Sequence, residues 1–147
     1  MKKFFYLVKF RYVVKNKILS QLDLGVFSTR KNAEKKILLS KNQPGFCEHS
    51  TNCFQIIKFA VDFNYEVADK SKEKLYCVCH EYEVEDNNEN VIWNIFDYFS
   101  ELELAKKKIE YLKKHSNIGK KYPNNFDIVE INVDNYSAWS SGFVSVI

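Results

Sequence analysis

Six side chains of the types that ligate zinc lie in two short segments of the chain. They are Cys47, His49, Cys53, Cys77, Cys79 and His80. Zinc is bound tetrahedrally by thiolates and imidazoles, and structural sites usually contain two close pairs such as Cys-x-x-Cys. The spacing here is irregular, and cysteine is also among the most frequently buried residue types. We therefore predict packed thiols, no metal and no cofactor, with these six residues as the alternative set of metal ligands.

A catalytic nucleophile would need a base beside it. Cys79 and His80 are neighbours on an expected strand, so their side chains point to opposite faces of the sheet. His115 falls late in an expected helix, where an interaction with the helix dipole is the ordinary explanation. The chain shows no motif with a known mechanism. We predict that the protein is not an enzyme, and we keep an uncharacterised enzyme as an alternative.

An internal repeat organises these residues. Residues 26–62 align with residues 98–134 without a gap, and about a third of the aligned positions are identical. The repeat copies Asp62 as Asp134, a pair that could form a twofold metal or acid–base site. Duplication of a turn-forming aspartate also accounts for the pair, and we favour that structural role. We predict a single domain over 1–147 with three parts: repeat one over 4–63, repeat two over 74–135 and a C-terminal extension over 136–147.

Each repeat has the same expected elements. Aromatic and β-branched residues mark a first strand, a polar turn follows, and a second strand ends at Phe27 in the first copy. Ser28 and its copy Ser100 stand at helix N-cap positions, and a last strand of alternating pattern begins at Phe54. The pattern predicts an α+β fold in which two tandem ββαβ repeats share one mainly antiparallel sheet. We expect both helices on one face of that sheet and an additional C-terminal strand.

The first strands of the two copies carry opposite charges. Lys9, Arg11 and Lys15 align with Cys79, Glu81 and Glu85, and Val13 aligns with Glu83. If the two strands pair antiparallel about a pseudo-twofold axis, Arg11 lies near Glu81 or Glu83. Otherwise the acidic face is free and is the surface offered to a partner. The expected partner-binding residues are Glu81, Glu83, Glu85, Trp139 and Phe143.

The overall charge creates no strong field for nucleic acid or an anionic membrane. The 22 basic and 19 acidic residues leave a net charge of +3, which would suit an acidic partner surface. Arg11 and Arg30 are the only arginines, so the planar guanidinium that reads bases and phosphates is scarce. The bias towards lysine and asparagine fits an AT-rich genome, such as that of a low-GC bacterium or its phage.

The N-terminal segment resembles a secretory signal only briefly. Its apolar run ends at Lys9 and Arg11, before the length that a signal peptide needs, and no later segment approaches the length of a membrane span. We therefore expect a cytoplasmic protein whose four cysteines stay reduced. A disulfide between Cys47 and Cys53 is expected only in an oxidising compartment.

Several motifs together resemble a known family. The second copy carries His80-Glu81-Tyr82-Glu83, a Phe-x-Ile strand that ends in Asp134, and the closing Trp139-x-x-Gly142-Phe143-Val144. The first copy carries Pro44-Gly45-Phe46 after its helix. These motifs resemble an uncharacterised bacterial domain family of unknown function, here duplicated. The resemblance implies a fold and no activity.

A small domain with this profile is most often a binding protein. We predict a non-enzymatic, protein-binding inhibitor of immunity or anti-defence type, with another protein as its partner and no membrane contact. The alternative from another class is a single-stranded RNA or DNA binding module. Its expected contact residues are Lys106, Lys107, Lys113 and Lys114.

Overall fold

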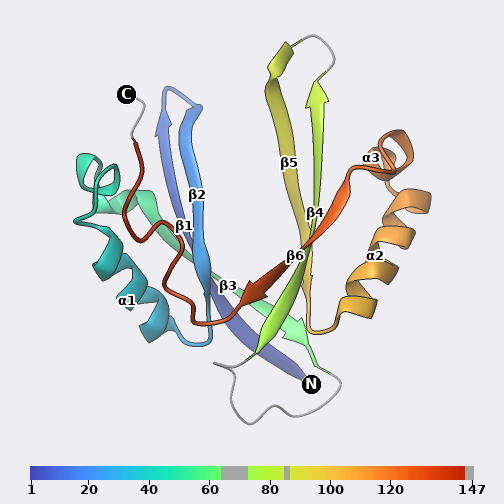
Figure 1. Cartoon of the computed structure of the whole chain (residues 1–147), viewed down its shortest axis with the longest axis horizontal. Helices are drawn as coiled ribbons and strands as arrows, with labels where there is room; N and C mark the ends of the chain where they lie inside the picture. Colours follow the sequence, from blue (N-terminus) through green and yellow to red (C-terminus); the bar gives the residue numbers. More distant parts are fainter. Residues whose placement is uncertain (64–72, 85–86, 145–147) are drawn as a thin grey trace. The chain divides into compact units, whose positions relative to one another are not determined.

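The computed structural model describes residues 1–63, 73–84 and 87–144, with the backbone alone for 84 and 87–93. The chain is α+β, as predicted, and the order strand, strand, helix, strand occurs twice (Figure 1). The elements of the first half are β1 (Lys2–Val14), β2 (Lys17–Phe27), α1 (Arg30–Ser40), the short 3-10 helices η1 (Phe46–Glu48) and η2 (Thr51–Cys53), and β3 (Phe54–Asp62). Those of the second half are β4 (Lys74–Val84), β5 (Asn87–Phe99), α2 (Leu102–His115), α3 (Asn117–Lys121) and β6 (Phe126–Asn132).

The strands form two sheets, so the prediction of one shared sheet is wrong. The strand orders are β2-β1-β3 and β5-β4-β6. β1 pairs antiparallel with both of its neighbours, and β4 pairs antiparallel with β5. Each first strand is therefore central and has both edges occupied, which excludes pairing of β1 with β4. The expected cross-strand pairs of Arg11 with Glu81 or Glu83 do not form within a sheet for this reason.

The chain divides into two compact units. Unit 1 contains Met1–Glu73 together with Asn132–Ile147, and unit 2 is Lys74–Ile131. The segment that follows β6 thus packs with the first repeat, although it continues from the second. The boundaries of the compact units therefore differ from those of the sequence repeats at the C-terminal end.

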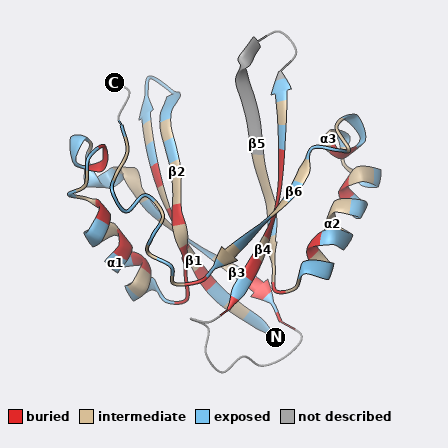
Figure 2. Ribbon diagram, in the orientation of Figure 1, coloured by how far each residue is buried: buried red, intermediate tan, exposed pale blue. Residues whose placement is uncertain are grey.

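The core of unit 1 lies between its sheet and α1. β1 contributes alternate residues such as Val8 and Phe10, and α1 contributes Ala33 (Figure 2). The N-terminus of α1 is capped by Thr29, whose side-chain oxygen accepts a hydrogen bond from the Asn32 amide at 3.1 Å. Burial of one strand face fixes the register of the strands, and burial of one helix face fixes which side of α1 faces the sheet.

The core of unit 2 is built in the same way. Val78 of β4 packs with Ala105 and Leu112 of α2, and Phe99 and Phe126 lie against this cluster. Ala105, Ile109 and Leu112 recur at helical spacing, so they share one apolar face of α2. The helix and the sheet of unit 2 therefore bury each other.

The helix boundaries differ from the prediction in detail. Thr29 and Glu101 are the N-cap residues, one position after the predicted Ser28 and Ser100. Ser28 donates from its amide and its hydroxyl to the Asp134 carboxylate instead, at 2.9 and 2.6 Å. The short helix α3 has no counterpart in the predicted ββαβ repeat.

The predicted C-terminal strand is absent from residues 135–144, and residues 145–147 lie outside the described part of the chain. Asp134, Trp139 and Gly142 have φ values of 59°, 55° and 82°. Extended strands require negative φ, so these turns prevent the tail from running as a strand.

Candidate binding groove

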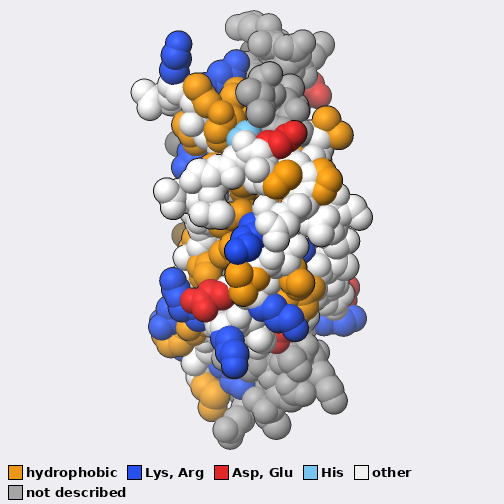
Figure 3. Space-filling model, turned by 90° about the vertical axis from the view of Figure 1, so that its left-hand side faces the viewer, with side chains coloured by type: hydrophobic (Ala, Val, Ile, Leu, Met, Phe, Trp, Pro, Cys, Tyr) orange, Lys and Arg blue, Asp and Glu red, His pale blue; other side chains and the backbone are white. Residues whose placement is uncertain are grey.

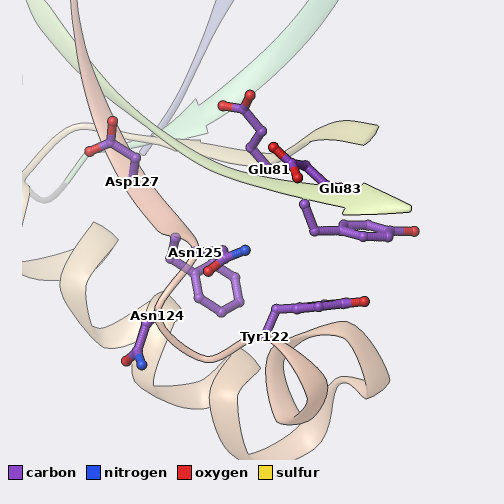
Figure 4. A pocket seen from close by; sticks show the side chains of 8 residues that line it. Glu81, Glu83, Tyr122, Asn124, Asn125 and Asp127 are labelled. Atoms are coloured by element: carbon purple, nitrogen blue, oxygen red, sulfur yellow. The ribbon is translucent and has the colours of Figure 1, made fainter. Parts of the chain in front are cut away.

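A groove of about 590 Å³ lies in unit 2 at the end of β4 (Figure 4). Its other walls come from the start of β6 and from the loop that precedes β6. The residues that line it are Glu81, Tyr82, Glu83, Tyr122, Asn124, Asn125, Phe126 and Asp127. We call this surface the acidic groove. Two of the glutamates predicted to bind a partner therefore lie in one concave surface.

The strand periodicity of β4 exposes the two glutamates. Successive side chains of a strand point to opposite faces, so Glu81 and Glu83 share the face opposite to Val78 and His80. Val78 and His80 are buried, and the two glutamates are exposed. Figure 4 shows Glu81 and Glu83 next to each other on the strand, with Asp127 on β6.

The groove begins where the pairing of β4 with β6 ends. The Glu81 amide donates to the carbonyl oxygen of Asn125 at 3.3 Å. An antiparallel ladder would next place Pro123 opposite Glu83, and proline has no amide hydrogen to donate. Pro123 therefore accounts for the end of the ladder, and the chain turns away from β4 at this point.

Two tyrosines stack at one end of the groove. The rings of Tyr82 and Tyr122 are 4.9 Å apart between centroids and inclined by 17°. The ammonium of Lys121 lies 5.4 Å from the centroid of the Tyr122 ring. Tyr82 points to the same face of β4 as His80, so the stack borders the groove on the face opposite to Glu81 and Glu83.

His80 holds the loop that carries Tyr122. It is 1% exposed, and its Nε2 donates to the Tyr122 carbonyl oxygen at 2.9 Å. Its ring also meets the Phe126 ring edge to face at 4.5 Å. Within the described part of the chain, Nδ1 of His80 is buried without a hydrogen-bond partner. The histidine is therefore a positioning residue of the groove, since it lies beneath the groove wall and not in its lining.

The lining of the groove is negatively charged. Glu81, Glu83 and Asp127 contribute carboxylates, and none of the described lining residues is a lysine or an arginine. The three carboxylates are exposed, so each keeps its charge accessible to a ligand. In the view of Figure 3, by contrast, Lys and Arg side chains are scattered among hydrophobic ones and acidic side chains are few. The groove is thus a local negative site on a chain of net charge +3.

The other predicted partner-binding residues lie elsewhere. Glu85 is outside the described residues. Trp139 and Phe143 belong to the tail in unit 1, where Trp139 is 44% exposed. The Phe143 ring packs on Phe10 and Phe46, with centroid distances of 5.6 and 4.8 Å. Phe143 therefore has a packing role, and Trp139 is the exposed aromatic residue of the tail.

Two of the sequence motifs dock on each other in unit 1. The Phe143 amide donates to the Pro44 carbonyl oxygen at 2.9 Å. A Cβ atom at Gly45 would overlap the Phe143 carbonyl oxygen, and one at Gly142 would overlap the Pro44 carbonyl oxygen. Both glycines also have positive φ, which disfavours any side chain. The Pro-Gly-Phe motif of the first repeat is thus completed by the closing Gly-Phe of the tail.

The tail is held to unit 1 by two further side chains. The Asp134 carboxylate accepts from the Ser28 amide and hydroxyl and from Asn32 Nδ2, the last at 3.2 Å. Lys36 is 1% exposed and donates to the carbonyls of Tyr136 and Ala138 at 2.9 and 2.7 Å. Burial lowers the pKa of the Lys36 ammonium. These contacts give Asp134 a structural role, as predicted.

Asp62, the copy of Asp134, ends β3 in register with Lys2 of β1. It therefore belongs to the sheet of unit 1, at the strand end where the sequence placed it. Asp62 is the last residue of β3, whereas Asp134 lies in a turn two residues after the end of β6, so the predicted strand that ends in Asp134 is shorter than expected.

The cysteines are free thiols. Cys77 and Cys79 are buried in β4, Cys53 is partly buried and Cys47 is exposed. The Cys79 thiol lies 3.5 Å from the Asp127 carbonyl oxygen. Among the described residues, no three side chains of His, Cys, Asp or Glu gather as a metal site would require. Burial raises the pKa of the Cys53 thiol, which disfavours its thiolate form.

The lysines predicted to contact nucleic acid lie on α2. Lys106 and Lys113 face Glu103 and Glu110 of the same helix, each pair at 3.4 Å. Lys107 and Lys114 are exposed. Half of this predicted set is therefore partly neutralised by neighbours on the helix.

Sequence reasoning missed the groove residues that come from the start of β6 and from the loop before it. Tyr122, Asn125 and Asp127 reach the groove only because β6 returns to pair with β4. Pro123 was a usable signal, since it marks a position where a ladder must end. The acidic pattern of β4 identified Glu81 and Glu83 without this information.

No family model, curated protein or solved structure matches the chain. The resemblance to an uncharacterised bacterial family therefore stays a prediction. In the described part of the chain, no helix combines the length and the apolar character needed to cross a membrane.

Proposed function

We propose that the chain is a non-enzymatic, protein-binding inhibitor of immunity or anti-defence type from a low-GC bacterium or its phage. The observation that supports binding is the acidic groove, whose lining includes three exposed carboxylates and a stacked tyrosine pair. The inhibitor type is supported by the composition and size of the chain.

The character of the groove favours a protein over a small molecule. Small-molecule sites bury most of their ligand and are lined mainly by apolar side chains. This groove is lined by three exposed carboxylates and by asparagines, with tyrosine as its main aromatic type. Tyrosine is enriched at protein interfaces, where its ring packs while its hydroxyl stays near water.

The charge of the groove sets the character of the partner. The net charge of +3 suggests an acidic partner surface, but net charge averages over the whole chain. Local charge steers docking more directly, because screening limits electrostatic effects to about 10 Å in 0.1 M salt. We therefore propose that the partner presents a basic surface to Glu81, Glu83 and Asp127.

Affinity purification with charge-reversed variants tests this function. The bait is the tagged full chain expressed in a low-GC bacterium, and the test variant is Glu81→Lys with Glu83→Lys. The matched control is Glu103→Lys with Glu110→Lys, which reverses two exposed acids on α2 of the same unit. We expect one protein to co-purify in stoichiometric amount with the wild type and with the control. It should not co-purify with the test variant. That protein should lose its activity when the purified chain is added in equimolar amount. Equal recovery by all three baits would refute the groove as the binding surface.

A nucleic-acid-binding function is supported by one separate observation. Helices α2 and α3 together carry seven lysines and two glutamates. Exposed Tyr111 of α2 lies beside His115 and Lys108, with its ring 4.4 Å from the His115 ring. Binding of single-stranded RNA that weakens steeply with salt, and that is lost in Lys107→Glu with Lys114→Glu, would favour this second function.

A further inference from the structure

β4 extends beyond β6 at the acidic groove. Its neighbours in the sheet are β5 and β6. β5 follows β4 to its last residue, since Val84 is in register with Asn87. β6 begins only at Phe126, and the last bond on that side joins Glu81 to Asn125. The final residues of β4 therefore have a strand on one edge and the groove on the other.

The backbone of Glu83 is directed towards the groove. In an antiparallel strand, alternate residues direct their amide and carbonyl groups to the same edge. The Glu81 amide bonds to the β6 side, and the register with β5 is regular from Glu81 to Glu83. Glu83 is thus the next residue whose backbone groups face that side. Pro123 cannot satisfy them with an amide hydrogen.

The first repeat has different residues at the positions that form the acidic groove in the second repeat. Its aligned residues are Arg11, Tyr12 and Val13, so the glutamates are specific to the second repeat. The Tyr12 ring is covered by the His49 ring at 3.9 Å, in a segment that contains η1 and η2. Unit 1 therefore offers no acidic counterpart of the groove among these residues, and it serves as an internal comparison.

We infer that the acidic groove binds an extended segment of the partner, which adds as a strand beside β4 beyond Glu81 and carries Lys or Arg at alternating positions. This inference rests on the proposed function and specifies its partner. Residues two apart on the incoming strand lie on one face at the same spacing as Glu81 and Glu83, about 7 Å. The incoming residue that lies opposite Glu83 is diagonal to Glu81, whose own edge is paired with Asn125. A Lys or Arg side chain at that position can therefore reach both carboxylates.

The incoming strand contributes backbone and side-chain recognition together. Its amide and carbonyl groups pair with those of Glu83, which supplies affinity without dependence on sequence. Alternating cations supply specificity, because Glu81, Glu83 and Asp127 reject acidic side chains.

Peptide selection tests the inference. A phage library of random linear dodecapeptides is panned on the full chain, and the enriched peptides are synthesised. We expect Lys or Arg at alternating positions, and affinity at least about tenfold lower for Glu81→Lys with Glu83→Lys. Affinity should be unchanged for the control Glu103→Lys with Glu110→Lys. Failure to enrich cationic peptides that depend on Glu81 and Glu83 would overturn the inference.

Backbone methylation tests strand addition itself. N-methyl groups are placed on one set of alternating residues of the best peptide, and on the other set in a second peptide. We expect one methylated peptide to lose at least about tenfold in affinity, because its amides face β4, and the other to bind normally. Equal affinities of the two would overturn strand addition.

The two hypotheses fail in different ways. Strand addition is refuted if a partner protein requires Glu81 and Glu83 but the two methylated peptides bind equally. The proposed function is then still supported by the partner. The proposed function is refuted if no protein partner requires these glutamates. If only one of the two methylated peptides loses affinity in the same study, strand addition is still supported.

Discussion

Replacement of Asp134 by alanine should strongly destabilise unit 1. The Asp134 carboxylate accepts three hydrogen bonds from Ser28 and Asn32, at 2.6 to 3.2 Å. It also lies at the N-terminus of α1, where a negative charge is favourable. A hydrogen bond to a charged group contributes about 1.5–3 kcal/mol, but bonds at one half-buried carboxylate are not additive. We therefore expect a loss of about 2–4 kcal/mol in the free energy of unfolding.

The asparagine variant separates charge from hydrogen bonding. Asp134 has a φ of 59°, a conformation that asparagine and aspartate tolerate better than alanine. Asp134→Asn keeps one acceptor oxygen and the backbone preference, so we expect a loss of about 1 kcal/mol. Asp97→Ala is the matched control, because this exposed aspartate bonds only to the adjacent Tyr98 amide among the described contacts. We expect a change within about 0.5 kcal/mol for the control.

Urea unfolding followed by circular dichroism measures these differences. Because the chain forms two units, the slope of the transition must be compared between variants before free energies are read. In thermal unfolding, the loss in Asp134→Ala corresponds to a decrease of about 5–10 °C in Tm. A stability of Asp134→Ala equal to that of Asp97→Ala would contradict the role of the tail in completing unit 1.

Three further predictions concern the tail and the cysteines. Gly45→Ala and Gly142→Ala should each cost about 2 kcal/mol or more, because the new methyl groups overlap the carbonyls of Phe143 and Pro44. Their double variant should cost less than the two separate losses combined, since either one displaces the same tail; additive losses in urea unfolding would contradict this. Burial lowers the pKa of Lys36, so the unfolded chain binds more protons than the folded one just below pH 10.5. The stability of the wild type relative to Lys36→Met should therefore rise as the pH approaches 10.5, and a constant or falling difference across that range would refute the burial argument. The purified protein should contain less than about one tenth of an equivalent of zinc by elemental analysis, and stoichiometric zinc would contradict the assignment of free thiols.

Local patterns were sufficient to predict the three strands and the long helix of each repeat, but not the short helices η1, η2 and α3. The strand ends at Phe27 and Phe99, and the strand starts at Phe54 and Phe126, lie where the repeat placed them. Alternation and helical spacing are properties of a few neighbouring residues, so they can be read without the fold.

The arrangement of strands was not predictable from these patterns. The number of sheets depends on whether the last strand of each repeat pairs with the first strand. That pairing joins residues that are distant in the sequence, so local patterns do not show it. β3 does return to β1, in register from Lys2 with Asp62 to Phe10 with Phe54. β3 therefore occupies the edge of β1 that would have had to pair with β4 in a shared sheet.

The candidate site was predictable in part. Glu81 and Glu83 stood out because the first repeat has Arg11 and Val13 at their positions. Tyr122 and Asp127 did not, because their distance from β4 along the chain hides their proximity. The role of Ser28 was mistaken since its partner Asp134 lies in the distant tail.

The affinity of the purified partner for the charge-reversed chain tests the central claim most directly. Isothermal titration calorimetry would compare the wild type, Glu81→Lys with Glu83→Lys, and the α2 control. If the acidic groove is the binding surface, the reversal of two charges weakens binding by about 100-fold or more, and the control binds within about twofold of the wild type. An affinity of the groove variant equal to that of the wild type would contradict the account.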